Sequence, residues 1–204
     1  MGFKKSNTYQ EIFHQPEMWK QTYNIVLNSK SEVVNFFSAN FNDDVTVVLT
    51  GAGTSAFIGN ILQYLMSDYN VSNFKSVATT DITTHADSIF LKDKKYLLVS
   101  FARSGNSPEC IAAVDLADSI CGDNISHIYI TCNANGALAK REAKSNVLSL
   151  ILPEGTNDKA LAMTSSFSSM LLTAMLIFDI KNIEANKSQI DKLFEKAQYM
   201  LKTY

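Results

Sequence analysis

The amino-acid sequence predicts an α/β protein in which a parallel β-sheet is covered by helices on both faces. Short runs of apolar and β-branched residues alternate along the chain with segments whose apolar residues recur at helical spacing. The runs are apolar almost throughout, as expected of strands buried on both faces of a sheet. Two of the runs end in loops of glycine and hydroxyl residues that lead into helical segments.

Two helices are expected before the first strand. Pro16 suits the first turn of a helix, where the missing N–H of proline costs nothing, and apolar residues follow it at helical spacing as far as Leu27. Ser29 and Glu32 form the spacing of a capping box ahead of further apolar residues. The second helix is therefore predicted to begin at Ser29.

Five runs are predicted to be strands. Four are clear and one is weaker; in chain order they are residues 45–49, 76–80 (the weaker), 96–100, 127–131 and 147–152. Helical spacing follows the first run over residues 56–67 and resumes after the third run from Pro108.

Two helices are expected after the last strand. The helix from Thr164 is apolar on all sides, which predicts deep burial, and its most apolar part is too short to cross a bilayer. A final helix over residues 189–204 carries one apolar stripe with no glycine or proline stop after it. The organisation we expect is N-terminal helices, an α/β domain and a C-terminal helix, at residues 1–40, 41–185 and 186–204.

Charge and cysteine content narrow the possible partners. The chain has 18 basic and 20 acidic residues and a net charge of −2, which argues against a nucleic-acid or anionic membrane surface. Its cysteines, Cys110, Cys121 and Cys132, are odd in number and lack C-x-x-C spacing, so they are predicted to be buried free thiols. We expect a cytoplasmic protein without a metal or a cofactor.

Two loops are the strongest candidates for a binding site. Residues 51–55 and 104–107 each combine glycine, which lets a ligand approach the backbone, with hydroxyl groups and a following helix start, which attracts anions. In open α/β sheets, ligands bind where strands end and helices begin. Each loop alone could be an ordinary turn or helix cap. Together they predict a site that holds a terminal phosphate monoester from two sides.

A dinucleotide site is the main alternative at the first loop. Residues 51–56 also fit the G-x-G-x-x-A fingerprint of nicotinamide cofactor domains, and Asp81 ends the next strand. The second hydroxyl-rich loop favours a small phosphate instead, because a dinucleotide fold needs one phosphate-binding turn. Neither loop contains lysine, which excludes a nucleotide-binding P-loop.

At these loops the sequence resembles a sugar isomerase (SIS) domain, a phosphosugar-binding module. The stretches that carry the resemblance are LTGAGTSAFIG at residues 49–59, VSFARSGNSPE at 99–109, ITCN at 130–133 and MTSSFSSM at 163–170. They are similar to the first SIS domain of the tagatose-6-phosphate ketose/aldose isomerase branch, also described as galactosamine-6-phosphate deaminases. Residues 11–19 resemble the N-terminal helix of that branch. The resemblance implies a three-layer α/β/α, flavodoxin-like fold with a five-stranded parallel sheet.

The resemblance also implies a set of substrate-binding residues. The phosphate would be held by the two loops and the sugar would face the start of the helix after the last strand: Gly53, Thr54, Ser55, Arg103, Ser104, Gly105, Asn106 and Ser107 for the phosphate, and Met163, Thr164 and Ser165 for the sugar. Ala102 stands where many SIS domains have serine. The branch has two SIS domains in tandem, so the final helix is expected to lead to a second SIS domain, with a homo-oligomer as the other possible arrangement.

Moving a carbonyl between C1 and C2 of a sugar requires a base that transfers a proton between carbons and an acid/base group for the oxygens. By the resemblance, the catalytic Glu and His are expected from a second SIS domain or a neighbouring subunit. Within this chain the candidates are His85, Glu109 and Glu154, each of which follows a predicted strand or loop of the site. His14 and His127 are interpreted as structural.

Three functions follow from this interpretation. The first is isomerisation of a sugar phosphate of the tagatose 6-phosphate type, or deamination and isomerisation of an amino-sugar phosphate. The second is a non-catalytic module that senses a sugar phosphate. The absence of a basic helix-turn-helix segment from the sequence argues against a regulator that binds DNA. The third is the NAD-binding domain suggested by the first loop.

Overall fold

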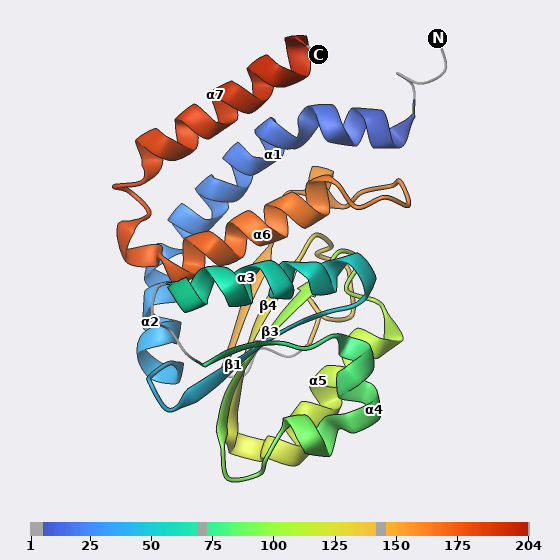
Figure 1. Ribbon diagram of the computed structural model, residues 1–204, viewed down its shortest axis with the longest axis vertical. Coiled ribbons are helices and arrows are strands. Elements are labelled where there is room, and N and C mark those ends of the chain that lie inside the picture. Colours follow the sequence, from blue (N-terminus) through green and yellow to red (C-terminus); the bar gives the residue numbers. More distant parts are fainter. Residues whose placement is uncertain (1–5, 69–72, 142–145, 204) are drawn as a thin grey trace.

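The computed structural model describes residues 6–68, 73–141 and 146–203. Its centre is a five-stranded, all-parallel sheet with strand order β2-β1-β3-β4-β5 (Figure 1). The strands are β1 (Val45–Gly51), β2 (Phe74–Ser76), β3 (Lys95–Ala102), β4 (Ile125–Thr131) and β5 (Val147–Ile151). The α-helices are α1 (Asn7–Asn28), α2 (Lys30–Asn40), α3 (Ala56–Asp68), α4 (Thr79–Ile89), α5 (Pro108–Cys121), α6 (Ser165–Phe178) and α7 (Lys187–Thr203). The predicted three-layer α/β/α fold is confirmed.

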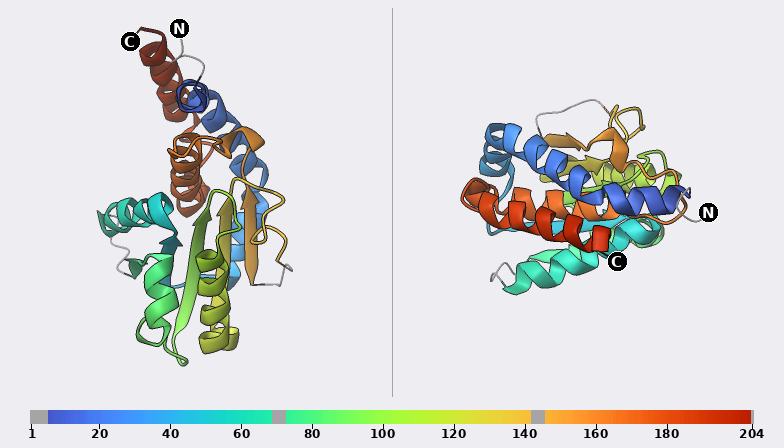
Figure 2. Two further views of the ribbon diagram at one scale, coloured as in Figure 1. Left: turned by 90° about the vertical axis from the view of Figure 1, so that its right-hand side faces the viewer. Right: turned by 90° about the horizontal axis from the view of Figure 1, so that it is seen from above.

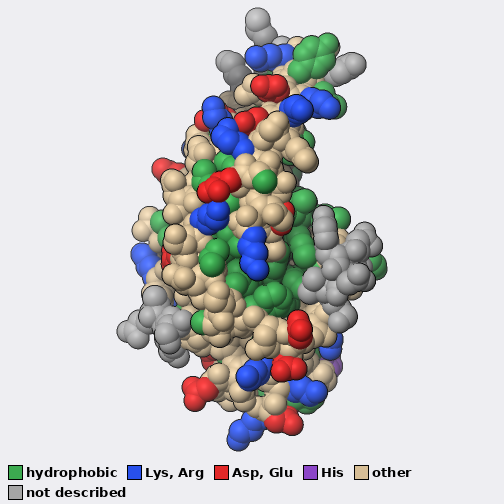
Figure 3. Space-filling model, turned by 90° about the vertical axis from the view of Figure 1, so that its left-hand side faces the viewer, with side chains coloured by type: hydrophobic (Ala, Val, Ile, Leu, Met, Phe, Trp, Pro, Cys, Tyr) green, Lys and Arg blue, Asp and Glu red, His purple; other side chains and the backbone are tan. Residues whose placement is uncertain are grey.

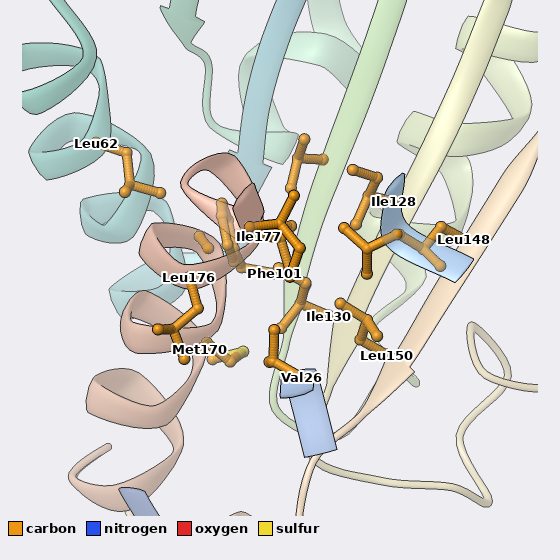
Figure 4. Packing of buried hydrophobic residues seen from close by; sticks show 14 of the residues in the cluster. Val26, Leu62, Phe101, Ile128, Ile130, Leu148, Leu150, Met170, Leu176 and Ile177 are labelled. Atoms are coloured by element: carbon orange, nitrogen blue, oxygen red, sulfur yellow. The ribbon is translucent and has the colours of Figure 1, made fainter. Parts of the chain in front are cut away.

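The two faces of the sheet carry two separate cores. Alternate residues of a strand point to opposite faces, so Leu97 and Val99 of β3 enter one core while Tyr96 and Leu98 enter the other. The larger core lies under α1, α2, α3 and α6, and the smaller one under α4 and α5 (Figures 1 and 2). In Figure 4, Met170 of α6 and Val26 of α1 point toward the side chains of β3, β4 and β5. Burial on both faces explains why the strands are apolar almost throughout.

Helix α1 begins nine residues before the position that Pro16 predicts. It starts after Ser6, whose hydroxyl accepts a hydrogen bond from the Tyr9 N–H, so Pro16 lies inside the helix rather than in its first turn. The carbonyl of Ile12, which a residue with an N–H at position 16 would have bonded, accepts a hydrogen bond from the Gln15 side-chain amide at 3.3 Å. Figure 1 shows α1 bending along its length, as expected of a helix with an internal proline.

The predicted capping box at Ser29 is wrong. Ser29 is the C-cap of α1 and the N-cap of α2, so the predicted start of the second helix is confirmed, but its side chain makes no capping hydrogen bond. Its backbone, at φ −87° and ψ 5°, lacks the extended conformation from which an N-cap hydroxyl reaches the helix. The two helices therefore join through one residue.

The region between β2 and β3 differs most from the prediction. The weak strand expected at residues 76–80 lies earlier, at Phe74–Ser76, and residues from Thr79 form α4. The helix contains four threonines and His85, five residues of low helix propensity, so its sequence does not look helical. The spacing of Ile82, Ala86 and Phe90, all buried, is the signal that identifies it.

The C-terminal helix α7 packs on α1, which in turn packs on α6 (Figures 1 and 2). Trp19 of α1 lies at this junction: its indole N–H donates to the Ser168 hydroxyl at 2.8 Å, and its ring centroid lies 6.4 Å from that of Phe194. The Tyr23 hydroxyl donates to the Ile183 carbonyl at 3.0 Å. These contacts tie the terminal helices to the α/β core; Tyr204, the last residue of the predicted helix, lies outside the described residues.

The surface of the molecule has an apolar pocket beside the end of α6. A pocket of about 360 Å³ lies between α2 and the end of α6, lined by apolar residues such as Phe37 and Ile177. Figure 3 shows apolar side chains gathered on the face where these helices meet. Within the described ranges, no helix is long and apolar enough to cross a membrane.

Candidate functional site

The candidate site lies where the order of the strands reverses. From β1 the chain crosses through α3 to the edge strand β2, whereas from β3 it crosses through α5 to β4 on the other side. The helices α3 and α5 therefore leave on opposite faces, and the carboxyl ends of β1 and β3 remain open between them. The strands are in register there, with Gly51 opposite Phe101. The two predicted loops are thus neighbours.

A pocket of about 160 Å³ separates these loops. Six of its lining residues were predicted to bind the substrate: Ser55, Arg103, Ser104, Gly105, Ser107 and Met163. The others, which sequence reasoning did not assign to a ligand, are Ala52, Phe101, Ala102 and Cys110. The structure therefore brings the two loops and the start of α6 to one small pocket.

The first loop turns sharply into α3. Gly53 has φ +56°, a conformation that side chains disfavour, and opens the short 3₁₀ helix η2 (Gly53–Ser55). A Cβ on Gly51 would lie 2.7 Å from Ser55, so the turn is closed by close backbone contact. Ser55 is buried and its Oγ lies 3.8 Å from the Met163 sulfur across the pocket. Gly53 and Thr54 are exposed on this turn and do not line the pocket.

The second loop carries most of the polar lining. Gly105 has φ +65°, and a Cβ there would lie 3.2 Å from the Thr131 hydroxyl. Ser107 is the N-cap of α5, because its hydroxyl accepts a hydrogen bond from the Cys110 N–H at 3.3 Å. The Ser104 hydroxyl accepts a hydrogen bond from the Asn106 N–H at 3.3 Å. Both hydroxyl groups keep their own proton to donate to a ligand.

A third loop, after β4, braces the second. The Asn133 side-chain amide donates to the Ser104 carbonyl at 2.9 Å, and the Asn106 side-chain oxygen accepts from the Ala137 N–H at 2.8 Å. Asn106 is exposed and does not line the pocket. Its side chain instead fixes the shape of the second loop, together with Asn133, which the sequence reasoning did not single out as a site residue.

The segment between β5 and α6 contributes Met163 to the far wall of the pocket. The buried Asp158 carboxylate accepts hydrogen bonds from the N–H groups of Thr164, Ser165 and Ser166 at 2.8 to 3.2 Å, and from the Thr164 and Ser166 hydroxyls. These N–H groups would otherwise be unsatisfied at the start of α6. The cap fixes the residue immediately before it, Met163, against the pocket.

Two of the residues expected to face the sugar have other partners. Thr164 donates its hydroxyl to Asp158, and the Ser165 side chain is fully buried between α1 and α6. The Ser165 hydroxyl donates to the Glu11 carbonyl at 2.8 Å and lies 2.6 Å from His14 Nε2. Because a hydroxyl has one proton, His14 donates through Nε2 in this arrangement. His14 therefore joins two helices.

The candidate catalytic residues do not line the pocket. His85 lies in α4, exposed, and its Nδ1 is 2.8 Å from the Thr84 hydroxyl. Glu109 is exposed in the first turn of α5, and Glu154 is exposed in the short 3₁₀ helix η4 (Glu154–Thr156) after β5. His127 is buried against Asp118, with Nε2 2.7 Å from its carboxylate.

The pocket offers hydrogen-bond donors and one cation rather than acid/base groups. None of the lining residues has a carboxylate or an imidazole. Burial raises the pKa of the Cys110 thiol to about 11, so the thiolate is scarce at neutral pH. No group of His, Cys, Asp and Glu within the described residues could hold a metal ion. The arrangement suits the binding of a small anion.

Comparisons with known proteins agree with this geometry. A family model described as "SIS domain" matches residues 41–179. The chain is 36% identical over 198 residues to D-galactosamine-6-phosphate deaminase AgaS of Escherichia coli, covering 96% of this chain and 51% of that protein. It is 35% identical to the protein of the same name from a Shewanella species, covering 95% of this chain and 50% of the relative.

Among solved structures, the tagatose-6-phosphate ketose/aldose isomerase of Escherichia coli superposes with a TM-score of 0.88 at 33% identity. The match covers 98% of this chain and 55% of that one. The chain thus spans about half the length of the curated relatives it matches.

Proposed function

Because this chain belongs to the SIS domain family, we propose that the pocket between β1 and β3 binds the phosphate of a sugar phosphate. The observation that carries the proposal is the meeting of two glycine- and hydroxyl-containing loops at one pocket beside the starts of α3 and α5. Backbone N–H groups, serine hydroxyls and Arg103 together can surround a dianionic phosphate, which requires no excess of basic residues in the chain.

The activity we propose is aldose/ketose isomerisation of a phosphosugar of the tagatose 6-phosphate type, or deamination of galactosamine 6-phosphate. Two named relatives and one solved structure support these substrates. In the deamination, one amino-sugar phosphate and one water give one ketose phosphate and one ammonia. Both reactions begin with a proton transfer between C1 and C2, which needs a general base.

We propose that most acid/base groups come from a second SIS domain or a partner subunit, because the pocket lining contains neither carboxylate nor imidazole. Within this chain the candidates are Glu154 after β5, Glu109 in the first turn of α5 and His85 in α4, and none of the three lines the pocket. The three free, buried cysteines support the cytoplasmic location that we assign.

The test is a binding experiment on the purified chain, and a turnover experiment on the chain with a second SIS domain present. Isothermal titration with galactosamine 6-phosphate and tagatose 6-phosphate should give saturable binding, and NAD should give none. The double variant Ser55→Ala, Ser104→Ala, which removes one lining hydroxyl from each loop, should weaken sugar-phosphate binding by about tenfold or more, because charge-assisted hydrogen bonds contribute about 1.5–3 kcal/mol each. An unchanged affinity in the folded double variant would show that the loops only form turns.

Turnover separates the enzyme from a non-catalytic sensor. An enzyme releases ammonia from galactosamine 6-phosphate or converts tagatose 6-phosphate, measured by coupled ammonia assay and by NMR. A pocket without acid/base side chains also suits a sensor, which would bind the same ligands without converting them even when a second SIS domain is added.

A further inference from the structure

We infer that Glu11 of α1 is a positioning residue that holds Arg103 in place to meet the phosphate, acting through Lys159 and Ala160. The inference rests on the proposed function, because it assigns a purpose to Arg103 in phosphate binding. It also gives α1, which lies outside the matched family region of residues 41–179, a role at the pocket.

The Glu11 side chain is committed to the segment that walls the pocket. It is 6% exposed, and its Oε1 accepts hydrogen bonds from the Lys159 N–H at 2.6 Å and the Ala160 N–H at 3.1 Å. Its Oε2 lies 3.4 Å from the same Ala160 nitrogen. A carboxylate that accepts from two successive N–H groups fixes the backbone on both sides of Lys159.

The Arg103 side chain is positioned by the carbonyl of Ala160. Its Nη1 donates to the Ala160 oxygen at 3.0 Å, and among the residues that line the pocket it is the only Lys or Arg. One hydrogen bond uses one of the five guanidinium N–H groups, so the others remain for a ligand. Residue Ala160 is therefore held by Glu11 through its N–H and holds Arg103 through its carbonyl.

The chemistry explains why a carboxylate suits position 11. Two N–H groups converge on one side chain in a buried place, and a charged acceptor binds both at short distance. The Glu11→Gln variant keeps the shape but loses the charge and can turn an NH₂ group toward the same donors. The 159–160 segment would then lose its anchor, and the Arg103 side chain would sample more rotamers.

The first test needs no ligand. The chain has two arginines, Arg103 and Arg141, so ¹⁵N-arginine labelling gives guanidinium spectra in which each can be assigned by substitution. In Glu11→Gln the Arg103 Nη signals should broaden toward their average, while Arg141, held by Asp115 and Asp118, should not change. Glu17→Gln, an exposed change on the same helix, is the matched control. If Glu11→Gln does not fold, Glu11→Asp, which keeps the charge but shortens the reach, replaces it.

The second test measures binding of inorganic phosphate and of galactosamine 6-phosphate by titration. Glu11→Gln should weaken both by about three- to tenfold, and should add nothing in an Arg103→Gln background, because the two residues act in one chain of contacts. Unchanged Arg103 signals in folded Glu11→Gln, or equal weakening in both backgrounds, would overturn the inference. Absence of binding to the wild-type chain would instead overturn the proposed function and, with it, the purpose assigned to Glu11.

Discussion

At the scale of single residues, the site depends on backbone conformations that side chains disfavour. Gly53 and Gly105 both have positive φ, one in each loop. They differ in their surroundings: a Cβ on Gly53 meets nothing within 4 Å, whereas one on Gly105 meets the Thr131 hydroxyl at 3.2 Å and Leu138 at 3.4 Å. The sequence predicts that both glycines lie in loops. Only the packing around them shows that a side chain has room at Gly53 and would press on its neighbours at Gly105.

This difference predicts unequal effects of the same substitution. Gly53→Ala should cost only the conformational penalty of positive φ, about 1 kcal/mol of unfolding free energy, and Gly105→Ala should cost about 2 kcal/mol or more because its neighbours must also move. Urea unfolding followed by circular dichroism measures both. Equal losses in the two variants would contradict the prediction.

At the scale of elements, the wall of the pocket is an example of a long-range helix cap. The start of α6 is capped by Asp158, six to eight residues earlier, and the segment is held in turn by Glu11 from the other end of the chain. Thr164 is the N-cap of α6, but its side chain makes no capping hydrogen bond to the helix. The N–H groups at the start of α6 are capped instead by the Asp158 carboxylate, whose position depends on tertiary structure.

The cap can be tested by Asp158→Asn, which keeps the side-chain shape but removes the charge that several buried donors share. We expect a loss of about 2–4 kcal/mol in unfolding free energy, since buried donors without a partner cost about 1–3 kcal/mol each. The matched control is Asp191→Asn in α7, an exposed ion pair with Lys187, for which we expect less than about 0.5 kcal/mol. Chemical denaturation compares the two, and a similar loss in both would refute the cap.

The elements that sequence reasoning predicts and those it misses differ for physical reasons. Strands β1, β3, β4 and β5 and the loops after β1 and β3 follow from local patterns, because buried strands and tight turns select residue types locally. Helix α4 is missed because its threonines resemble a polar loop. The contacts of Glu11 with Lys159 join positions 148 residues apart, which no local pattern encodes.

At the scale of the whole molecule, strand order decides where the site lies. The apolar runs predict a parallel sheet, but they do not specify that β1 and β3 are central neighbours. The crossovers through α3 and α5 on opposite faces open the pocket between these two strands. The resemblance of the loops to SIS domains supplies that arrangement, and the structure confirms the fold that it implies.

The buried thiols of the core make the free energy of unfolding depend on pH in the alkaline range. Burial raises the pKa of Cys110 and Cys121 to about 11 and that of Cys132 to about 12, from an ordinary value of 9.0. Above pH 9 the unfolded chain therefore releases thiol protons that the folded chain retains, so unfolding becomes more favourable as the pH rises through the range 9–12. The thermal midpoint should be level from about pH 7 to 8 and fall above pH 9.

Thermal unfolding by calorimetry across this pH range checks the prediction. Cys132→Ala should unfold at lower temperature at neutral pH, because it leaves a small cavity in a buried site, yet its midpoint should decline less steeply at alkaline pH. Curves of the wild type and the variant that run parallel above pH 9 would contradict the role of the thiol.

Trp19 is the only tryptophan of the chain, and it lies at the junction of α1, α6 and α7. Its ultraviolet emission therefore reports on one place in the molecule, without labelling. The emission maximum depends on how much water reaches the indole. Release of α7, which carries Phe194, would therefore expose the indole to solvent and shift the maximum while the sheet still gives its circular dichroism signal. The protein thus contains its own optical reporter for the attachment of its last helix.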